Sequence, residues 1–433
     1  MSRLEELLQT LCPDGVDYKE LGDVGKFFGG LTGKSKEDFQ NGNRKFISYM
    51  NVYKNPSVDL TAQDFVSINP DERQNEVNFG DILFTGSSET PEECGISSVM
   101  VQHPDEPIYL NSFTIGFRLH DSSLLIPDFS KHLFRSAELR KQINKTASGV
   151  TRFNVSKARM SKVIIPIPPL PVQEEIVRIL DTFTTLEMEL EAELAARTKQ
   201  YEHYRNELLS FDSKSKIMEK LIAEYYSDSV KYKKLGDIGT FFGGLTGKTK
   251  QDFQNGNKKF ISYMNVYKNP AVNINVKDFV RIGDEECQNI VEFGDILFTG
   301  SSETPEECGI SSVMVERPDE PFYLNSFTIG FRLHDPSLLI PEFSKHLFRS
   351  AEMRKQINKT ANGVTRFNVS KSKLSNVVVP IPSFEVQEKI VSILDRFEAL
   401  VNDLKSGLPA EIALRRKQYE HYRDTLLTFP QTN

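Results

Sequence analysis

Three features are scarce in this sequence, and each scarcity argues against a class of protein. The four cysteines, Cys12, Cys94, Cys287 and Cys308, include no CxxC pair, which argues against a disulfide framework or a zinc ribbon. No stretch approaches the ~20 apolar residues that a membrane-spanning helix needs, and the amino terminus has no apolar run of signal-peptide character. We therefore expect a cytoplasmic protein that does not enter a membrane.

Positive charge is the third scarce feature. The formal net charge is -7 at pH 7, whereas proteins that coat DNA regardless of sequence neutralise its phosphates with many Lys and Arg side chains. Local basic surfaces remain compatible with this average. The composition, 39% hydrophobic and 26% charged, is that of a globular protein, and 433 residues allow two or more domains.

The sequence contains two near-copies of one module. The run KFFGGLTGKSKEDFQNGNRKFISYMNVYKNP at Lys26 returns almost unchanged at Thr240, an offset of 214 residues. The same offset relates GDILFTGSSETPEECGISSVM at Gly80 and Gly294, YLNSFTIGFRLHD at positions 109 and 323, and GVTRFNVSK at positions 149 and 363. A repeat of this length is a domain and not a solenoid unit.

Substitutions between the copies cluster in one segment. Residues 57–78 have the sequence SVDLTAQDFVSINPDERQNEVN, and their counterparts 271–292 have AVNINVKDFVRIGDEECQNIVE. The flanking runs stay almost fixed. We expect an exposed loop here, because surface connections vary more readily than packed elements.

Each module ends in a proline-rich hinge and a long helical pattern. After VIIPIPPLPVQ at Val163, apolar residues recur every three or four positions, which predicts a helix from about Val172 to Leu209, about 55 Å long. The pattern after VVVPIPSFEVQ at Val377 has four additional residues, with Gly407 suited to a helix C-cap and Pro409 to a helix start. We expect a continuous central helix and a broken C-terminal one.

The two helical segments could pack in two ways. They could pair as a coiled coil with a globular domain at each end, or each could pack on its own domain. A helix of about 40 residues is too long for one face of a compact domain, which favours the coiled coil.

Within each module, short β-rich segments precede a helix. KFISYMNVY, GDILFTGSS, ISSVMVQ and FTIGFRL predict strands, and FSKHLFRSAELRKQINKTA predicts a helix. The expected class is α+β, with two tandem α/β domains joined by two long helices that pack as an antiparallel coiled coil with pseudo-twofold symmetry. The expected parts are domain 1 (1–165), a central helix (166–211), a linker (212–217), domain 2 (218–379) and a C-terminal helix (380–433).

The sequence shows no constellation for catalysis or metal binding. GGLTGKS at Gly29 resembles a P-loop, but GxxxxGK[ST] requires glycine where Phe28 and, in the second copy, Phe242 stand. What remains is a glycine-rich turn with Thr32 and Lys34 exposed, which either approaches a nucleic acid or is a plain tight turn. The seven histidines lack metal-ligand spacing, and neither a nucleophile elbow nor a methyltransferase motif occurs. We therefore do not expect a stand-alone enzyme.

The positive evidence is a local excess of basic residues. Residues 131–162 contain nine Lys and Arg against the single acid Glu138, and residues 345–376 contain eight against Glu352. In an acidic chain, such a run indicates a phosphate-binding surface or a solvated helix face.

Short motifs in and around this run supply side chains that can contact DNA. Arg and Asn can bind base edges, and Ser, Thr and Lys can bind phosphates or bases. Tyr53 and Glu89 belong to two of these motifs. The candidates in the first copy are Thr32, Lys34, Tyr49, Asn51, Lys54, Ser87, Ser88, Lys145, Thr151, Arg152 and Asn154. Their counterparts are Thr246, Lys248, Tyr263, Asn265, Lys268, Ser301, Ser302, Lys359, Thr365, Arg366 and Asn368.

Several motifs occur in the same order twice along the chain. They are GVTRFNVSK, the hinge-to-helix runs IPIPPLPVQEEIVRILD and VPIPSFEVQEKIVSILD, and the helix endings with KQYEHYR. In these motifs the whole chain resembles the specificity subunits of type I restriction-modification systems.

The resemblance implies a non-catalytic subunit whose two target-recognition domains each read half of a split DNA site. Its implied partners are double-stranded DNA, two methyltransferase subunits and, in some systems, endonuclease or translocase subunits. S-adenosylmethionine, ATP and Mg would belong to those partners, with no cofactor in this chain. The resemblance also implies that spacer length sets the gap between half-sites. The segment EAELAA near Glu191 is therefore expected to determine this gap.

The sequence departs from the family pattern in one respect. Its two recognition domains are almost the same, whereas those of the family generally differ. Two like domains on a dyad predict a palindromic or near-palindromic bipartite site. The alternative from another class is a scaffold whose twin domains bind two copies of a protein partner.

Overall fold

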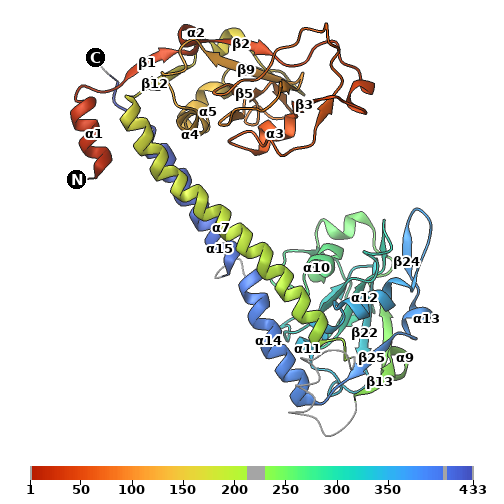
Figure 1. Cartoon of the computed structure of the whole chain (residues 1–433). Helices are drawn as coiled ribbons and strands as arrows, with labels where there is room; N and C mark the ends of the chain where they lie inside the picture. The colour runs from red at the N-terminus through yellow and green to blue at the C-terminus, as the bar shows by residue number, and fades with distance from the viewer. Residues whose placement is uncertain (1, 212–229, 403–406, 432–433) are drawn as a thin grey trace. The chain divides into compact units, whose positions relative to one another are not determined.

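The computed structural model describes residues 2–211, 230–402 and 407–431, and the predicted linker 212–217 lies outside these ranges. The chain divides into two compact units. The first comprises residues 1–191 and 411–433, and the second comprises residues 192–410 (Figure 1). Within the described ranges, no helix combines the length and apolar character needed to cross a membrane.

A four-stranded antiparallel sheet forms the centre of the first unit, with strand order β2-β9-β5-β7. Phe84 and Phe117, on the two central strands, are fully buried in one apolar core with residues of two helices, α4 and α5. The bounds are β2 (Gly25–Gly29), β5 (Ile82–Thr85), β7 (Ser97–Val99), β9 (Thr114–Leu119), α4 (Pro127–Leu133) and α5 (Ala137–Asn144).

Three smaller sheets surround this centre, in the orders β1-β12, β4-β3-β8 and β10-β11-β6. Their strands are β1 (Asp17–Glu20), β3 (Arg44–Ile47), β4 (Phe65–Val66), β6 (Ser87–Ser88), β8 (Tyr109–Leu110), β10 (Ala147–Ser148), β11 (Phe153–Val155) and β12 (Ile164–Ile167). The short helices are α1 (Arg3–Leu11), α2 (Leu21–Val24), η1 (Glu37–Phe39), α3 (Tyr49–Lys54) and α6 (Lys157–Met160).

The second unit repeats the elements from β1 to β12 and adds one short strand, β17, which extends the sheet β16-β15-β21-β17. Its strands are β13 (Lys231–Lys234), β14 (Gly239–Gly243), β15 (Lys258–Ile261), β16 (Phe279–Val280), β17 (Ile290–Val291), β18 (Ile296–Thr299), β19 (Ser301–Ser302), β20 (Ser311–Val313), β21 (Phe322–Leu324), β22 (Thr328–Leu333), β23 (Ala361–Asn362), β24 (Phe367–Val369) and β25 (Val378–Ile381). Its helices before the long arm are α9 (Leu235–Ile238), η2 (Lys250–Phe253), α10 (Tyr263–Lys268), α11 (Pro341–Leu347), α12 (Ala351–Asn358) and α13 (Lys371–Leu374).

Two predicted elements are wrong in detail. YMNVYK forms helix α3 and does not extend strand β3, because Ser48 has the extended backbone of an N-cap and the Asn51 side chain turns inward to bond the backbone of Asp59. FSKHLFRSAELRKQIN forms two helices and not one. The first is capped at Phe134, and Ser136, again extended, begins the second.

The divergent segment 57–78 follows the surface, as predicted. Thirteen of its 22 positions differ between the copies, and none of these thirteen is buried in either unit. Its four buried residues, Val58, Val66, Ile68 and Val77, are unchanged in the second copy. All differences within this segment therefore fall at positions that are not buried.

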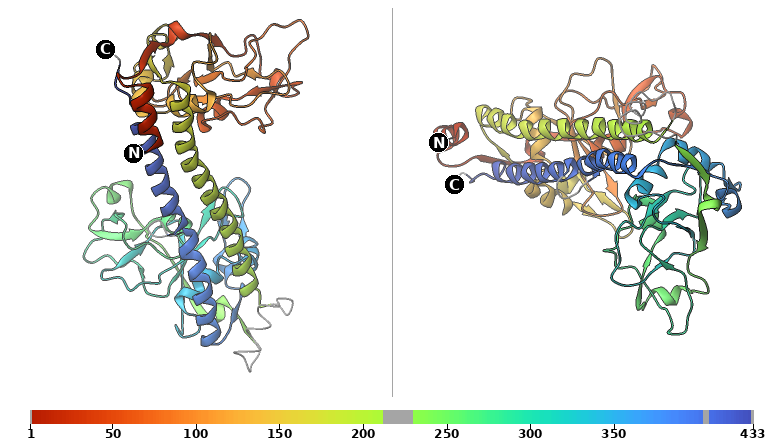
Figure 2. Two further views of the ribbon diagram at one scale, coloured as in Figure 1. Left: turned by 60° about the vertical axis from the view of Figure 1, so that its left-hand side comes forward. Right: turned by 90° about the horizontal axis from the view of Figure 1, so that it is seen from below.

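The long helices also match their prediction. Helix α7 runs unbroken over Leu170–Leu208, whereas the C-terminal segment comprises α14 (Phe384–Asn402) and α15 (Leu408–Leu426). Pro409 lies in the first turn of α15, and the predicted cap at Gly407 adjoins residues 403–406, which are outside the described ranges. The first part of α7 packs antiparallel to α15 in the first unit, and its last part packs antiparallel to α14 in the second (Figure 2).

Each unit is completed by a helix that belongs to the other copy in sequence. In the first unit, His132 of α4 places Nε2 2.8 Å from Asp181 of α7 and Nδ1 2.8 Å from the Tyr419 hydroxyl of α15. The second unit has the same arrangement, at 2.7 and 3.2 Å, with His346, Asp395 and Tyr201.

This exchange decides between the two packing alternatives. Helix α15 follows the second copy but packs in the first unit, and the last part of α7 follows the first copy but packs in the second. The helices therefore do not each pack on their own domain alone. The predicted combination of α/β domains with antiparallel paired helices is confirmed.

Candidate nucleic-acid interface

Three of the sequence motifs meet at one open cavity of the first unit. Its volume is about 470 Å³, and its lining comes from α3, β6 with the following loop, the turn before β9 and the loop between β10 and β11. Antiparallel pairing of β6 with β11 brings these segments together. The lining residues are Tyr49, Met50, Tyr53, Ser87, Ser88, Glu89, Glu93, Phe113, Thr151 and Arg152.

The Arg152 guanidinium is one of two charged groups that are held in place in this lining. Its Nη2 and Nε donate to the Ser87 hydroxyl at 3.0 and 3.3 Å, and its Cζ lies 5.4 Å from the centre of the Phe113 ring. These described partners are neutral, so they orient the guanidinium without compensating its charge. The side chain is exposed and can bind an acceptor-rich ligand.

The Glu93 carboxylate is the second of these charged groups. Its Oε2 accepts from the Ser88 hydroxyl at 2.8 Å, and its Oε1 accepts from the Tyr53 hydroxyl at 2.9 Å. These two hydrogen bonds lower the pKa of Glu93, so the group is ionised at neutral pH. Tyr49 stacks on Tyr53 and donates to the Ser87 carbonyl at 2.8 Å, which fixes the aromatic wall behind the carboxylate.

Apolar side chains are exposed at and beside the cavity. Phe113 is 57% exposed, Met50 is 48% exposed, and Val150, next to Thr151 of the lining, is 92% exposed. Grouped exposed apolar residues mark binding surfaces more often than isolated ones do. The cavity thus combines a fixed donor, a fixed acceptor and apolar contacts, which are the means by which proteins address base edges.

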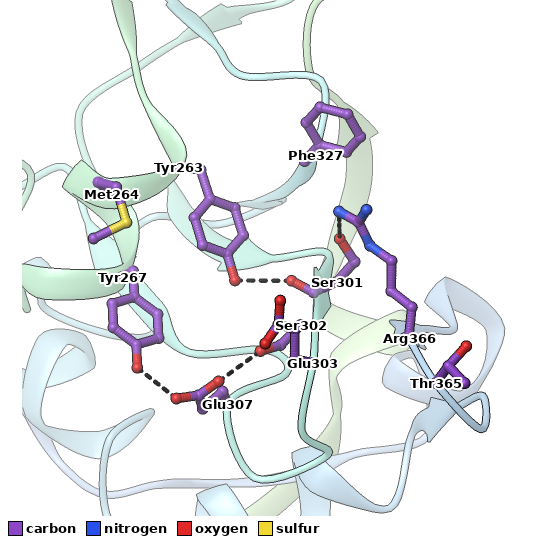
Figure 3. A pocket seen from close by; sticks show the side chains of 10 residues that line it. All are labelled: Tyr263, Met264, Tyr267, Ser301, Ser302, Glu303, Glu307, Phe327, Thr365 and Arg366. Atoms are coloured by element: carbon purple, nitrogen blue, oxygen red, sulfur yellow. Dashed lines mark hydrogen bonds between the residues drawn. The ribbon is translucent and has the colours of Figure 1, made fainter. Parts of the chain in front are cut away.

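The second unit holds the same cavity, also about 470 Å³, and its ten lining residues are the same amino acids at the equivalent positions. Figure 3 shows Arg366 and Glu307 on different elements of this lining. Arg366 donates to the Ser301 hydroxyl at 3.2 Å and lies 5.6 Å from the Phe327 ring centre. Glu307 accepts from Tyr267 and Ser302, at 2.8 Å each.

The structure brings five of the eleven predicted residues of each copy into the cavity lining. In the first unit these are Tyr49, Ser87, Ser88, Thr151 and Arg152, and in the second they are Tyr263, Ser301, Ser302, Thr365 and Arg366. A further four per copy are exposed outside the lining, namely Thr32, Lys54, Lys145 and Asn154 with Thr246, Lys268, Lys359 and Asn368. All of them stay predictions of DNA contact.

Lys34 is expected from the sequence to be exposed, but the structure shows that it is largely buried. Only 7% of its side chain is accessible, because Nζ pairs with Glu72 and donates to the Ser67 carbonyl at 2.6 Å. The pairing lowers the pKa of Glu72 to about 2. Lys248 and Glu286 form the same pair in the second unit. The glycine-rich run is thus a tight turn, with Gly33 at φ +68°, that is tied to the divergent segment.

Two other predicted residues have internal partners. The backbone N–H of Thr32 donates to the Gln74 side chain at 3.0 Å, although Thr32 itself is exposed. Asn51 is 6% exposed, and its amide donates to the Asp59 carbonyl at 2.8 Å. Thr246 and Asn265 repeat both contacts. In this conformation Asn51 and Asn265 stabilise the loop after α3 and α10 and do not face a ligand.

The basic run is only partly a surface. Arg135 donates to the Ser97 and Asn55 carbonyls, and Lys131 pairs with Asp181 of α7. Arg140 donates to the backbone carbonyls of Glu92, Cys94 and Gly95. Burial lowers the pKa of both arginines to about 10, so they remain charged. The six exposed members of the run are Lys141, Lys145, Arg152, Lys157, Arg159 and Lys162.

The sequence motifs did not predict Met50, Glu93 or Phe113 as members of the site. Each lies in a run that is identical in the two copies, but most of the domain is equally well preserved between them. What distinguishes Phe113 and Phe327 appears only in the structure, where these aromatic side chains are 57% and 58% exposed although aromatic residues are usually buried.

Among the described residues, one cluster has the side-chain types of a metal site, namely His346, Asp395 and Glu398. The Lys345 ammonium lies 2.9 Å from Asp395 and 2.8 Å from Glu398. A cationic side chain therefore already neutralises these carboxylates. We interpret the cluster as part of the contact between α11 and α14.

Comparisons with known proteins bear on the whole chain. A family model described as type I restriction modification DNA specificity domain matches residues 13–200 and 227–414. The chain is 32% identical over 295 residues to the type I restriction enzyme EcoR124I/EcoR124II specificity subunit of Escherichia coli, a match that covers 64% of this chain and 65% of that protein. It is 31% identical over 290 residues to a putative type I restriction enzyme specificity subunit of Haemophilus influenzae, which covers 65% and 68%.

The fold has a counterpart among solved structures. A chain from a structure concerned with complex assembly and conformational transition of the type I R-M system has a TM-score of 0.61 and 16% identity, over 96% of this chain and 98% of that one. At this identity the likeness concerns the fold. The family model matches most of the chain as two successive domains, and the chain therefore belongs to the family of type I restriction-modification DNA specificity proteins.

Proposed function

We propose that this chain is the non-catalytic DNA sequence-specificity subunit of a type I restriction-modification complex, and that it reads a bipartite site with equivalent half-sites. The observation that carries the proposal is the pair of cavities with identical lining. Identical donors, acceptors and apolar groups in the same local fold select the same bases. Two equal half-sites in opposite directions form a palindromic or near-palindromic target.

The parts of the chain have separate roles in this proposal. Residues 1–165 and 218–379 act as the target-recognition domains, and residues 166–211 and 380–433 act as the spacer. Two methyltransferase subunits dock on the complex, and endonuclease or translocase subunits can join. The chemistry with S-adenosylmethionine, ATP and Mg belongs to these partners, in the cytoplasm. Spacer length near Glu191, which pairs with Arg416 of α15, sets the gap between the half-sites.

Methylome sequencing of cells that carry this subunit with its methyltransferase tests the proposal. We expect adenine methylation at one bipartite motif whose two halves have the same sequence on opposite strands. Two unrelated half-sites would contradict the equivalence of the two domains.

A scaffold that binds two copies of a protein partner is the alternative from another class. A gel-shift experiment on random-sequence duplexes, with the methyltransferase present, separates the two. Selection of a defined sequence supports the DNA-binding role, and absence of any selected sequence supports the scaffold.

A further inference from the structure

We propose that each cavity reads one G·C base pair in the major groove, with Arg152 or Arg366 on the guanine and Glu93 or Glu307 on the amino group of the cytosine. This inference rests on the proposed function. It names the base pair that the site selects.

The carboxylate restricts the ligand most strongly. An ionised carboxylate only accepts hydrogen bonds. Ser88 and Tyr53 each donate to one oxygen of Glu93, and Thr90 adds a weaker side-chain contact, so of about four lone-pair sites at least one remains for a ligand. In the major groove the only donors are the amino groups of cytosine (N4) and adenine (N6). A keto oxygen of thymine or guanine at this contact would leave two acceptors facing each other. Glu93 therefore selects cytosine or adenine.

The guanidinium imposes the opposite requirement. Arg152 is a donor only, and its hydrogen bonds to Ser87 engage Nε and Nη2, so the N–H groups of Nη1 remain for a ligand. Guanine offers two adjacent acceptors, O6 and N7, whereas adenine offers an acceptor beside a donor. The contact with the Phe113 ring already restricts the Arg152 side chain in the free protein, so less side-chain entropy is lost when it binds a ligand. Arg152 therefore selects guanine.

Both requirements meet in a single base pair only for G·C. The A·T pair offers an amino group but not the paired acceptors that Arg152 needs. A phosphate could satisfy the arginine, but Glu89 and Glu93 belong to the same lining, and ionised carboxylates beside a phosphate are repulsive. The repulsion favours a base edge over the DNA backbone as the ligand of this cavity.

The duplication of the cavity allows a test with an internal control. Glu307→Gln changes only the second cavity, and the first cavity, left intact in the same molecule, reports whether the complex has assembled. Glu306→Gln is the matched control, because it removes a neighbouring, exposed carboxylate of the same loop that lies outside the cavity lining. The experiment uses the full chain with its methyltransferase and compares methylomes of the wild type and the variants.

We expect a G·C pair at the same position of both wild-type half-sites. In Glu307→Gln, discrimination at that position should fall about 5- to 150-fold in one half-site only, and the other half-site should stay unchanged. Arg366→Gln should relax the same base pair. Glu306→Gln should leave the motif as in the wild type.

Three results would overturn the assignment. One is a wild-type motif without a G·C pair at equivalent positions of its halves, and another is unchanged discrimination at every position in Glu307→Gln. The third is a uniform loss of methylation over all sites in Arg366→Gln, together with a shallower salt dependence of binding, which would mean that the arginine holds a phosphate. A wild type without any defined motif would instead contradict the proposed function itself.

Discussion

The two copies of the repeat are alike where they form the cavities and unlike where they form the long helices. All ten lining residues are the same in the two units, whereas α7 is unbroken and its counterpart is divided into α14 and α15 with four additional residues. The surface segment 57–78 has also diverged at thirteen positions without any change in its buried residues. Between the two copies the cavity lining is thus unchanged, whereas the long helices and the non-buried positions of the outer segment differ.

Removal of the second copy is expected to have the largest effect on this comparison. Residues 1–211 should dimerise through α7, with Tyr201 of one chain taking the place of Tyr419 beside His132 of the other. The half-sites should be unchanged, but the spacer would lack the four additional residues of the C-terminal segment. Four residues correspond to about 6 Å at the helical rise of 1.5 Å per residue, so the gap should change by about two base pairs. Light scattering and methylome sequencing measure both outcomes. A truncated chain that supports no site-specific methylation would show that α7 of a second chain cannot replace the C-terminal helical segment.

Loss of one cavity arginine should make the two units unequal. Arg152→Ala should weaken binding by about 1 to 3 kcal/mol if the side chain contacts a base, and should relax one position of one half-site only. Arg366→Ala should do the same in the other half-site. Binding titrations on the wild-type target at several salt concentrations check this, with Lys141→Ala as an exposed control on the same basic run. Equal relaxation of both half-sites by either variant would be inconsistent with one cavity per half-site.

Acid should weaken the contact of α4 with the long helices α7 and α15 in the first unit. Burial lowers the pKa of His132 below its ordinary value of 6.5, although Asp181 acts in the opposite direction. The unfolded chain then binds more protons than the folded one, so stability is present above pH 6.5 and is lost as the pH falls below it. Thermal unfolding between pH 8 and pH 5 should show a falling midpoint, and His132→Asn should make the decline shallower. An identical decline in His132→Asn would assign the acid sensitivity to other groups.

The smallest expected difference concerns the two tyrosines of the KQYEHYR motifs. The Tyr419 hydroxyl lies 2.8 Å from His132, and the Tyr201 hydroxyl lies 3.2 Å from His346. Tyr419→Phe should cost about 1 kcal/mol of stability, and Tyr201→Phe should cost less, because the longer hydrogen bond is the weaker one. Urea unfolding of both variants measures the two losses of unfolding free energy. A larger loss for Tyr201→Phe would show that the tyrosine–histidine hydrogen bond of the first unit is not the stronger one.

Much of the fold could be predicted because its determinants are local or repeated. The offset of 214 residues defines two domains, and strand periodicity locates β5, β7 and β9. Pro409 marks the start of α15 after the break in the C-terminal helical segment. Helix α3 could not be predicted, because it depends on an inward-facing Asn51 whose partner, Asp59, is supplied by a loop that the local pattern does not specify.

The site shows the same limit. Motif arguments found Arg152, Ser87 and Tyr49, but they also selected Lys34, which a sequence pattern cannot distinguish from an exposed lysine. Arg135 appeared to belong to a phosphate-binding run, yet its acceptors are backbone carbonyls about 40 to 80 positions earlier in the chain. Which charges face inward depends on contacts between distant segments, and only the three-dimensional structure shows them.

The exchange of helices has a consequence for the order of events during synthesis. The sheets of the first unit can form as soon as β12 has left the ribosome. Helix α15, which supplies Tyr419, follows more than two hundred residues later. At about 5 to 20 residues per second, that delay is about 12 to 50 s. Throughout this interval α7 can already contact α4 through Asp181 and His132, but His132 lacks the Tyr419 hydroxyl and the first unit lacks α15.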